Sequence, residues 1–75
     1  MHRYGDTTGN SGVTAFEVLP DGIKVQFSNG PVYLYTYGSA GQAAIEQMKE
    51  AALSGRGLAT YISRHVKGRF AERLR

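Results

Sequence analysis

The sequence predicts a small α+β domain, with a three-stranded antiparallel β-meander followed by two α-helices that pack on one face of the sheet (β-β-β-α-α). Runs of alternating apolar and polar residues, rich in β-formers, fill the first half of the chain and are separated by turn sequences. In the second half, apolar residues recur every three to four positions, as in an amphipathic helix. A chain of 75 residues is long enough for one domain with a thin core.

Three segments are expected to form the strands: 13–19, 23–28 and 32–37. A four-residue loop from Leu19 to Gly22 would place Phe16 and Val18 in the core and Glu17 in water, which avoids burying a carboxylate. Residues 1–12 are polar and glycine-rich, and we expect them to be a flexible N-terminal segment.

The loop before the third strand determines which way its tyrosines point. Asn29-Gly30 is a strong hairpin signal, but a two-residue loop would need an amide hydrogen at Pro31, which has none. A three-residue loop with Gly30 at positive φ removes this conflict and turns Tyr33 and Tyr35 toward the core. A shift of one residue would instead put both rings on the open face, as a platform for stacking bases. We favour the core-facing register.

The first helix is expected to begin at Ser39, because Ser39 and Gln42 have the spacing of a capping box. Gly55 is its expected C-cap. Five residues form its apolar face: Ala44, Ile45, Met48, Ala51 and Ala52. The sequence therefore predicts that the outer side of this helix, with Glu46 and Glu50, faces solvent.

The second helix is expected to start near Leu58 and to bury Leu58, Ile62 and Val66, which are spaced four apart. Gly68 offers a break. The domain is therefore expected to span residues 13–67, and residues 68–75 to form either a basic C-terminal tail or a separate short helical turn.

Charge is distributed unevenly along the chain. Residues 1–55 carry three basic and five acidic side chains, for a net charge of −2, whereas residues 56–75 carry six basic and one acidic, for a net charge of +5. Such asymmetry indicates a polyanionic partner, although basic surfaces have other uses. Six residues are candidates for contact with RNA or another nucleic acid: Arg56, Arg64, Lys67, Arg69, Arg73 and, by stacking, Tyr37, the tyrosine of its strand that we expect to be most exposed.

The run IKVQFSNGPVYLY resembles the centre of the KTSC domain, a small module named for the C-terminus of some lysyl-tRNA synthetases. That family shows an apolar–x–Val–x–Phe strand, an Asn-Gly turn and a Tyr-x-Tyr pair, here Tyr33 and Tyr35. Further on, three residues match the family's spacing, Ala51, Gly55 and Ile62, and three depart from it, Leu53, Leu58 and Ala59. The similarity covers about residues 13 to 66. It implies the fold above and a small bacterial or phage protein of uncharacterised function, for which RNA binding has been proposed from the synthetase context.

No catalytic constellation is recognisable, and we expect a binding module rather than an enzyme, with no cofactor and no metal site. The first hypothesis is binding of RNA or another polyanion through the basic C-terminal helix and tail. The alternative is a protein partner or a homodimer formed through the open sheet face, where Val32, Leu34 and Thr36 would lie. The absence of cysteine and of an apolar leader predicts a cytoplasmic protein without a membrane anchor.

Overall fold

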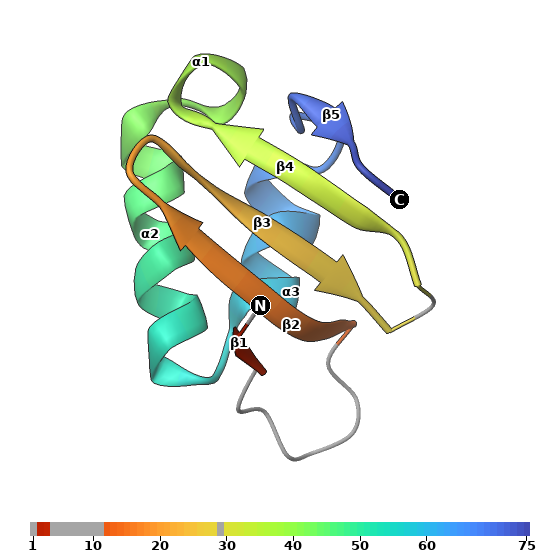
Figure 1. Cartoon of the computed structure of the whole chain (residues 1–75). Helices are drawn as coiled ribbons and strands as arrows, with labels where there is room; N and C mark the ends of the chain where they lie inside the picture. The colour runs from red at the N-terminus through yellow and green to blue at the C-terminus, as the bar shows by residue number, and fades with distance from the viewer. Residues whose placement is uncertain (1, 4–11, 29) are drawn as a thin grey trace.

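The computed structural model, which describes residues 2–3, 12–28 and 30–75, shows an α+β fold with an antiparallel sheet and helices on one face of it (Figure 1). The elements are β1 (His2–Arg3), β2 (Val13–Leu19), β3 (Gly22–Phe27), β4 (Val32–Thr36), α1 (Tyr37–Ala40), α2 (Gln42–Ser54), α3 (Leu58–Tyr61), the π-helical turn η1 (Ile62–Val66) and β5 (Glu72–Arg73). The predicted β-β-β-α-α order is confirmed for β2 to η1, and a two-residue strand is added at each edge.

The β3–β4 hairpin has the predicted register. Val25 lies opposite Tyr33 and Ile23 opposite Tyr35. The Phe27 amide donates a 2.9 Å hydrogen bond to the Pro31 carbonyl, and Gly30 has a φ of 109°. Asn29, which we singled out with Gly30, lies outside the described residues. Tyr33 and Tyr35 therefore face the helices.

The β2–β3 hairpin also keeps its expected register, with Val18 opposite Ile23, but Leu19 and Gly22 pair as well, so the turn is shorter than predicted. The prediction that Val18 is a core residue is wrong, because Val18 is 39% exposed. The short β1 pairs with β2 only at Ala15 and Phe16, so it provides no neighbour for Val18.

A β-bulge lies near the start of β2, between Val13 and Ala15. The extra residue, Thr14, shifts the alternation, so Val13 and Phe16 are both buried although they are three residues apart. Strict alternation would have placed Val13 on the open face.

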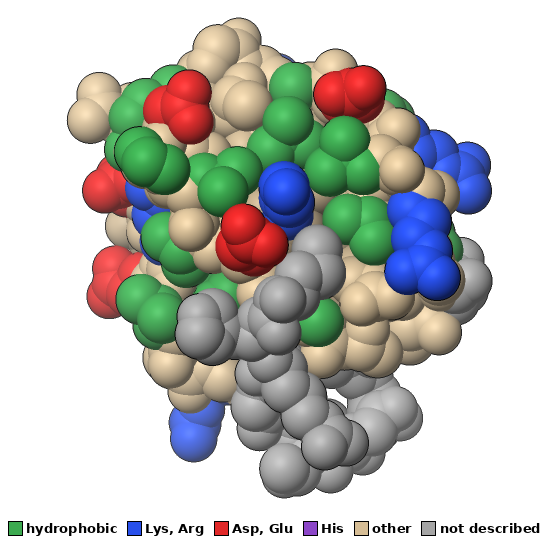
Figure 2. Space-filling model, in the orientation of Figure 1, with side chains coloured by type: hydrophobic (Ala, Val, Ile, Leu, Met, Phe, Trp, Pro, Cys, Tyr) green, Lys and Arg blue, Asp and Glu red, His purple; other side chains and the backbone are tan. Residues whose placement is uncertain are grey.

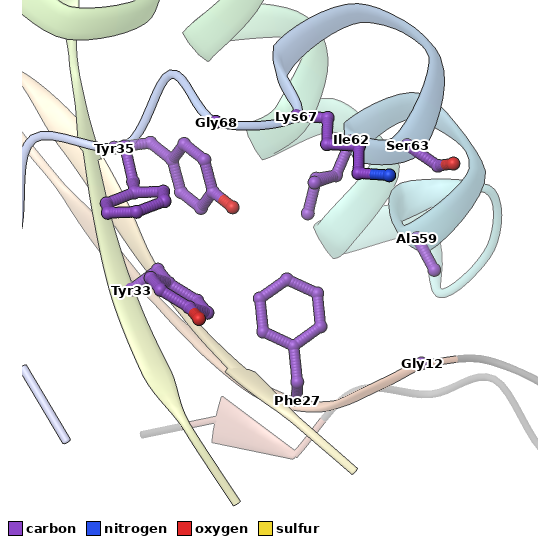
Figure 3. A pocket seen from close by; sticks show the side chains of 10 residues that line it. Gly12, Phe27, Tyr33, Tyr35, Ala59, Ile62, Ser63, Lys67 and Gly68 are labelled. Atoms are coloured by element: carbon purple, nitrogen blue, oxygen red, sulfur yellow. The ribbon is translucent and has the colours of Figure 1, made fainter. Parts of the chain in front are cut away.

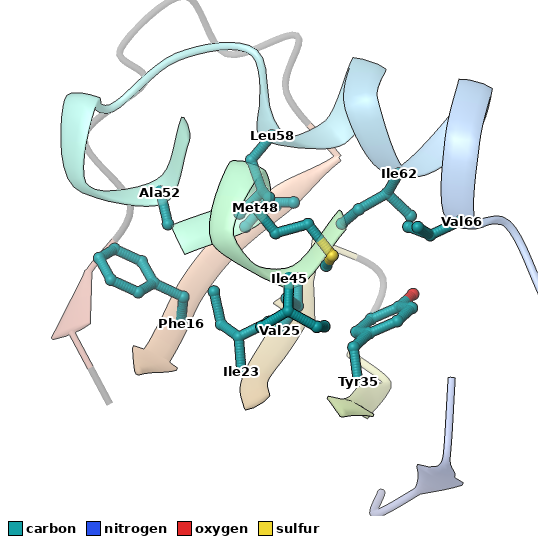
Figure 4. Close-up of a cluster of buried hydrophobic side chains, with 11 residues drawn as sticks. Phe16, Ile23, Val25, Tyr35, Ile45, Met48, Ala52, Leu58, Ile62 and Val66 are labelled. Carbon is teal, nitrogen blue, oxygen red and sulfur yellow. The ribbon is translucent and has the colours of Figure 1, made fainter. Parts of the chain in front are cut away.

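The helices bury their predicted apolar faces against the sheet (Figure 4). Ile45, Met48 and Ala52 of α2 are buried, as are Leu58, Ile62 and Val66 of the second helical segment. Gly55 is the C-cap of α2, with a φ of 80°. The sheet contributes Phe16, Ile23, Val25 and Tyr35 to the same core.

The capping box predicted for Ser39 and Gln42 is wrong. The Thr36 side chain accepts a 3.1 Å hydrogen bond from the Ser39 amide, and the Ser39 hydroxyl accepts a 3.0 Å bond from the Thr36 amide. This reciprocal pair caps the separate short helix α1, with serine in the place usually taken by Glu or Gln. Helix α2 begins one turn later, after Gly41, without a side-chain cap.

Segments near both ends of the chain form short edge strands, although we expected a flexible segment at the N-terminus and a tail or helical turn at the C-terminus. His2–Arg3 pair with β2, while residues 1 and 4–11 of the predicted flexible segment lie outside the described residues. After Gly68, the segment expected to be a tail or a helical turn runs antiparallel to β4 and forms β5. The Ala71 amide donates to the Leu34 carbonyl, and the Leu74 amide donates to the Val32 carbonyl. These carbonyls belong to the edge of β4 that β3 leaves unpaired. Because the pairing depends on that edge, no local pattern in 68–75 could predict it.

Candidate functional site

A pocket of about 490 Å³ opens between the helix-facing side of the β3–β4 hairpin, the helix α3–η1 and the segment that leads into β5 (Figure 3). Its lining residues are Gly12, Phe27, Tyr33, Tyr35, Ala59, Ile62, Ser63, Lys67, Gly68 and Phe70. The volume lies within the usual range of small-molecule sites. The pocket is thus the candidate site, at the place where the two halves of the chain meet.

Four aromatic rings wall this pocket, three from β3 and β4 and one, Phe70, from the segment that leads into β5. The Phe27 and Tyr33 rings are edge to face, with centroids 5.5 Å apart. Phe70 lies 4.5 Å from Tyr33 and 6.4 Å from Tyr35, centroid to centroid. Phe70 remains 38% exposed, so the aromatic wall reaches the molecular surface. A planar apolar guest would find ring faces and ring edges here.

The hydroxyls of Tyr33 and Tyr35 point into the pocket, toward the helix (Figure 3). Tyr35 is only 2% exposed, and within the described part of the chain its hydroxyl has no hydrogen-bond partner. Burial, together with the neighbouring Tyr33, raises the pKa of Tyr35 to about 12. The hydroxyl therefore stays protonated at neutral pH and can both donate and accept.

The helical side of the pocket carries its polar rim. Ser63 and Lys67 are four residues apart, and both line the pocket with exposed side chains. They belong to the region of η1, a π-helical turn, which is a rare element that often marks functional sites. The rim therefore combines a hydroxyl and one ammonium group.

The predicted basic residues lie in two places. Lys67 lines the pocket, and Arg73 lies against the ring of its wall residue Tyr33. Arg64 and Arg69 are chain neighbours of lining residues, and we call Arg64, Lys67, Arg69 and Arg73 the cationic rim. All four are exposed, and none forms an ion pair with another described residue. Arg56 is also exposed, but it precedes α3, at the opposite end of the helical segment from Lys67, about 15 Å away by helical rise. The structure does not bring Arg56 to the pocket.

Arg73 reaches the pocket wall from the edge of the sheet. It is paired with Tyr33 in the β4–β5 ladder, and its guanidinium lies 5.8 Å from the centroid of the Tyr33 ring. Its Nε donates a 3.1 Å hydrogen bond to the Arg75 carbonyl. The cation is thus held beside the aromatic wall.

Tyr37 is not the free stacking residue that we expected. Its hydroxyl donates a 2.9 Å hydrogen bond to Glu46, and the Lys49 ammonium lies 5.3 Å from its ring centroid. The hydrogen bond from Tyr37, and then that from Lys49, lower the pKa of Glu46. Tyr37 is half-buried and packs beside the core, so one side of its ring is engaged within the protein.

The sequence analysis missed Phe27, Phe70 and Ser63 as site residues. Phe27 lies on the helix-facing side of its strand, and nothing local distinguishes a core ring from a ring at a pocket. Phe70 belongs to a segment whose strand is two residues long, too short for a periodic pattern. Its position two residues after the Gly68 break was the available signal.

The opposite face of the sheet is open and partly apolar, as Figure 2 shows with hydrophobic side chains around a basic one. Val32 is 6% exposed, so it is less accessible than we expected, because the C-terminal segment runs beside it. Leu34 is half-buried, and Leu74 is 42% exposed. This face is a second candidate surface.

Comparison of the chain with protein-family models, curated proteins and solved structures finds no match. The resemblance to the KTSC domain therefore stays a prediction. Among residues 2–3, 12–28 and 30–75, no three His, Asp or Glu side chains gather in a way that could hold a metal ion. The helices of the described residues are all too short or too polar to cross a membrane.

Proposed function

We propose that this chain is a small, non-enzymatic module that binds single-stranded RNA, or another single-stranded nucleic acid, through the cationic rim. One observation carries the proposal. Four exposed cations, without side-chain carboxylate partners among the described residues, lie on the two segments that border a pocket walled by aromatic rings; Lys67 lines the pocket and Arg73 contacts its wall. Phosphates attract the cations, and unpaired bases have faces that can meet aromatic side chains.

The arrangement of the rim favours a flexible single strand over a rigid duplex. Arg64 lies in η1 and Lys67 directly follows it, three residues further on, while Arg69 and Arg73 lie on the segment that crosses to the sheet. A strand that contacts all four must bend around the mouth of the pocket. Because these contacts are to phosphates, they confer little sequence preference.

The test is fluorescence anisotropy with a labelled single-stranded RNA, between about 50 and 200 mM salt. Four phosphate contacts at about −0.7 each predict a log-log salt slope of roughly −3. Replacing both Arg64 and Lys67 with alanine should weaken binding for all sequences alike and flatten the slope by about one to one and a half units. Folding should not change, because both side chains are exposed.

A matched control removes the same charge elsewhere. The double variant Lys24→Ala/Arg56→Ala loses one cation from the open face and one from the far end of the helix. It should keep most of the salt slope. Absence of binding at the lowest salt would contradict the proposal, as would equal losses in the two double variants.

Self-association through the open sheet face is the second candidate. The observation in its favour is the partly accessible pair Leu34 and Leu74 on that face. Two apolar side chains of this kind are a small patch compared with a stable interface. Sedimentation of the protein alone at two concentrations decides between a monomer and a dimer before the binding measurements begin.

A further inference from the structure

We propose that the aromatic pocket takes one base of the bound strand, while Lys67 engages the phosphate next to that base. This inference rests on the proposed function and deepens it, because it adds a contact to the base that the cationic rim alone does not provide. The pocket and the rim are joined at Lys67, which belongs to both.

The shape of the pocket suits one flat ring system. Its volume of about 490 Å³ accommodates a small ligand, and its aromatic wall consists of rings that meet edge to face or at a tilt. Phe27 and Tyr33 are inclined by 71°, and Tyr33 and Phe70 by 42°. Since the rings are not stacked in parallel on one another, they leave faces and edges available to a guest. An inserted base would contact Ile62 and Ala59 from the helical side.

The polar groups inside suit a base rather than a purely apolar guest. The hydroxyls of Tyr33 and Tyr35 point into the space, and Ser63 adds a third hydroxyl at the rim. Each hydroxyl can donate or accept, so the three together can meet the donors and acceptors on the edge of any base. The Tyr35 hydroxyl has no partner within the described residues, so a base would supply one. We therefore expect the pocket to require a base but to discriminate weakly among the four.

The charge of the pocket also selects its occupant. Lys67 is the charged residue among those that line it, and Arg73 contacts the Tyr33 ring from the side. Around this mouth the cationic rim presents positive charge, which suits a base that carries a phosphate and disfavours a cationic aromatic compound. A single strand supplies such a base with further phosphates on either side for Arg64 and Arg69.

The experiment compares two labelled strands of equal length by fluorescence anisotropy: a single-stranded RNA, and a strand of abasic sugar phosphates. Both carry the same number of phosphates, so the rim should bind them alike. The base-bearing strand should bind about tenfold more tightly, as one stacked base contributes. A free nucleoside monophosphate serves as a third ligand and should bind far more weakly than the RNA.

A pocket variant identifies where the bases act. Ser63 lines the pocket with an exposed side chain, so Ser63→Leu should occupy its mouth without disturbing the core. This variant should bind the RNA only as tightly as the abasic strand, whose affinity should be unchanged. Thr60→Leu is the matched control, since Thr60 is exposed on the same helix and does not line the pocket.

The outcomes separate the inference from the function on which it rests. Equal affinity for the two strands, or a tenfold preference that survives in Ser63→Leu, would overturn the pocket assignment and leave phosphate binding intact. A nucleoside monophosphate that binds as tightly as the RNA would overturn the assignment to a strand. Failure of both strands to bind at low salt would overturn the proposed function and the inference together.

Discussion

Tyr35 serves both the core and the pocket. Its ring is buried with Ile23 and Val25, while its hydroxyl points into the pocket beside Ile62. A tyrosine accommodates both roles because its body is apolar and its tip is polar. The sequence analysis treated a core position and a ligand-binding position as alternatives, because a strand side chain faces only one side of the sheet. The structure joins them, because the pocket opens on the same side of the sheet as the core.

The partly desolvated hydroxyl of Tyr35 predicts a loss of stability in alkali. Its pKa is about 12 in the folded protein, raised by burial from the ordinary value of 10.0. Above pH 10 the unfolded chain releases a proton that the folded chain retains. The contribution of Tyr35 to the free energy of unfolding is therefore at its maximum below pH 10. The free energy of unfolding should fall between about pH 10 and 12, on the order of 1 kcal/mol per pH unit.

Urea denaturation at several pH values between 9 and 11.5 measures this effect. Tyr35→Phe keeps the ring and removes the titrating group, so its stability should decline less steeply above pH 10. Tyr61→Phe is the control for loss of a tyrosine outside the pocket. Identical pH profiles for the parent and Tyr35→Phe would show that this hydroxyl is not the group responsible.

Among the elements, the β3–β4 hairpin depends most directly on one residue. Gly30 has a φ of 109°, and a Cβ there would meet no atom within 4 Å. Gly30→Ala should therefore destabilise the protein through backbone strain alone, by about 1 kcal/mol. Urea denaturation measures the difference. Gly38→Ala is the comparison, because Gly38 lies in α1 without a positive φ, and it should be neutral or stabilising. If Gly30→Ala were as stable as the parent, the strained loop would not be what sets the register.

The elements that the sequence predicted are those with local signals. Pro31 fixed the hairpin loop, and the four-residue spacing of Leu58, Ile62 and Val66 identified the second helix. The sequence analysis was wrong where the structure depends on which residues come together in the fold. Ser39 had two possible capping partners, and Thr36 prevailed over Gln42 because the backbone turns immediately after β4.

At the scale of the whole molecule, β5 connects the sheet to the pocket. It holds Phe70 and Arg73 against Tyr33, and it depends on backbone bonds to β4 such as the one from the Leu74 amide to Val32.

Leu74→Pro removes that donor and should destabilise the protein by about 1 kcal/mol. The loss of RNA affinity should be larger than this loss of stability accounts for. Urea denaturation and anisotropy measure the two effects. Leu74→Ala keeps the amide and controls for the side chain. An unaltered affinity in Leu74→Pro would show that binding does not need the docked segment.

The candidate site could be predicted only in part for the same reason. The cations of residues 56–75 were evident from their number, and the exposure of Arg64 and Lys67 follows from the helical period. The pocket was not predictable, because it requires Phe27 and Phe70, which are far apart in the chain, to pack against the same ring, that of Tyr33. The separation of Arg56 from the other cations likewise depends on how the helical segment lies along the sheet.

The β4–β5 pairing also has a consequence for the order of assembly in time. Leu19 pairs with Gly22 across a tight turn, whereas Tyr33 pairs with Arg73, roughly forty residues further along the chain. Closing a long loop costs more entropy than closing a short one, and contacts between distant residues form slowly. The hairpins should thus form early, and the C-terminal segment should dock late. A refolding molecule would pass through a stage that has a sheet and a core but no finished pocket.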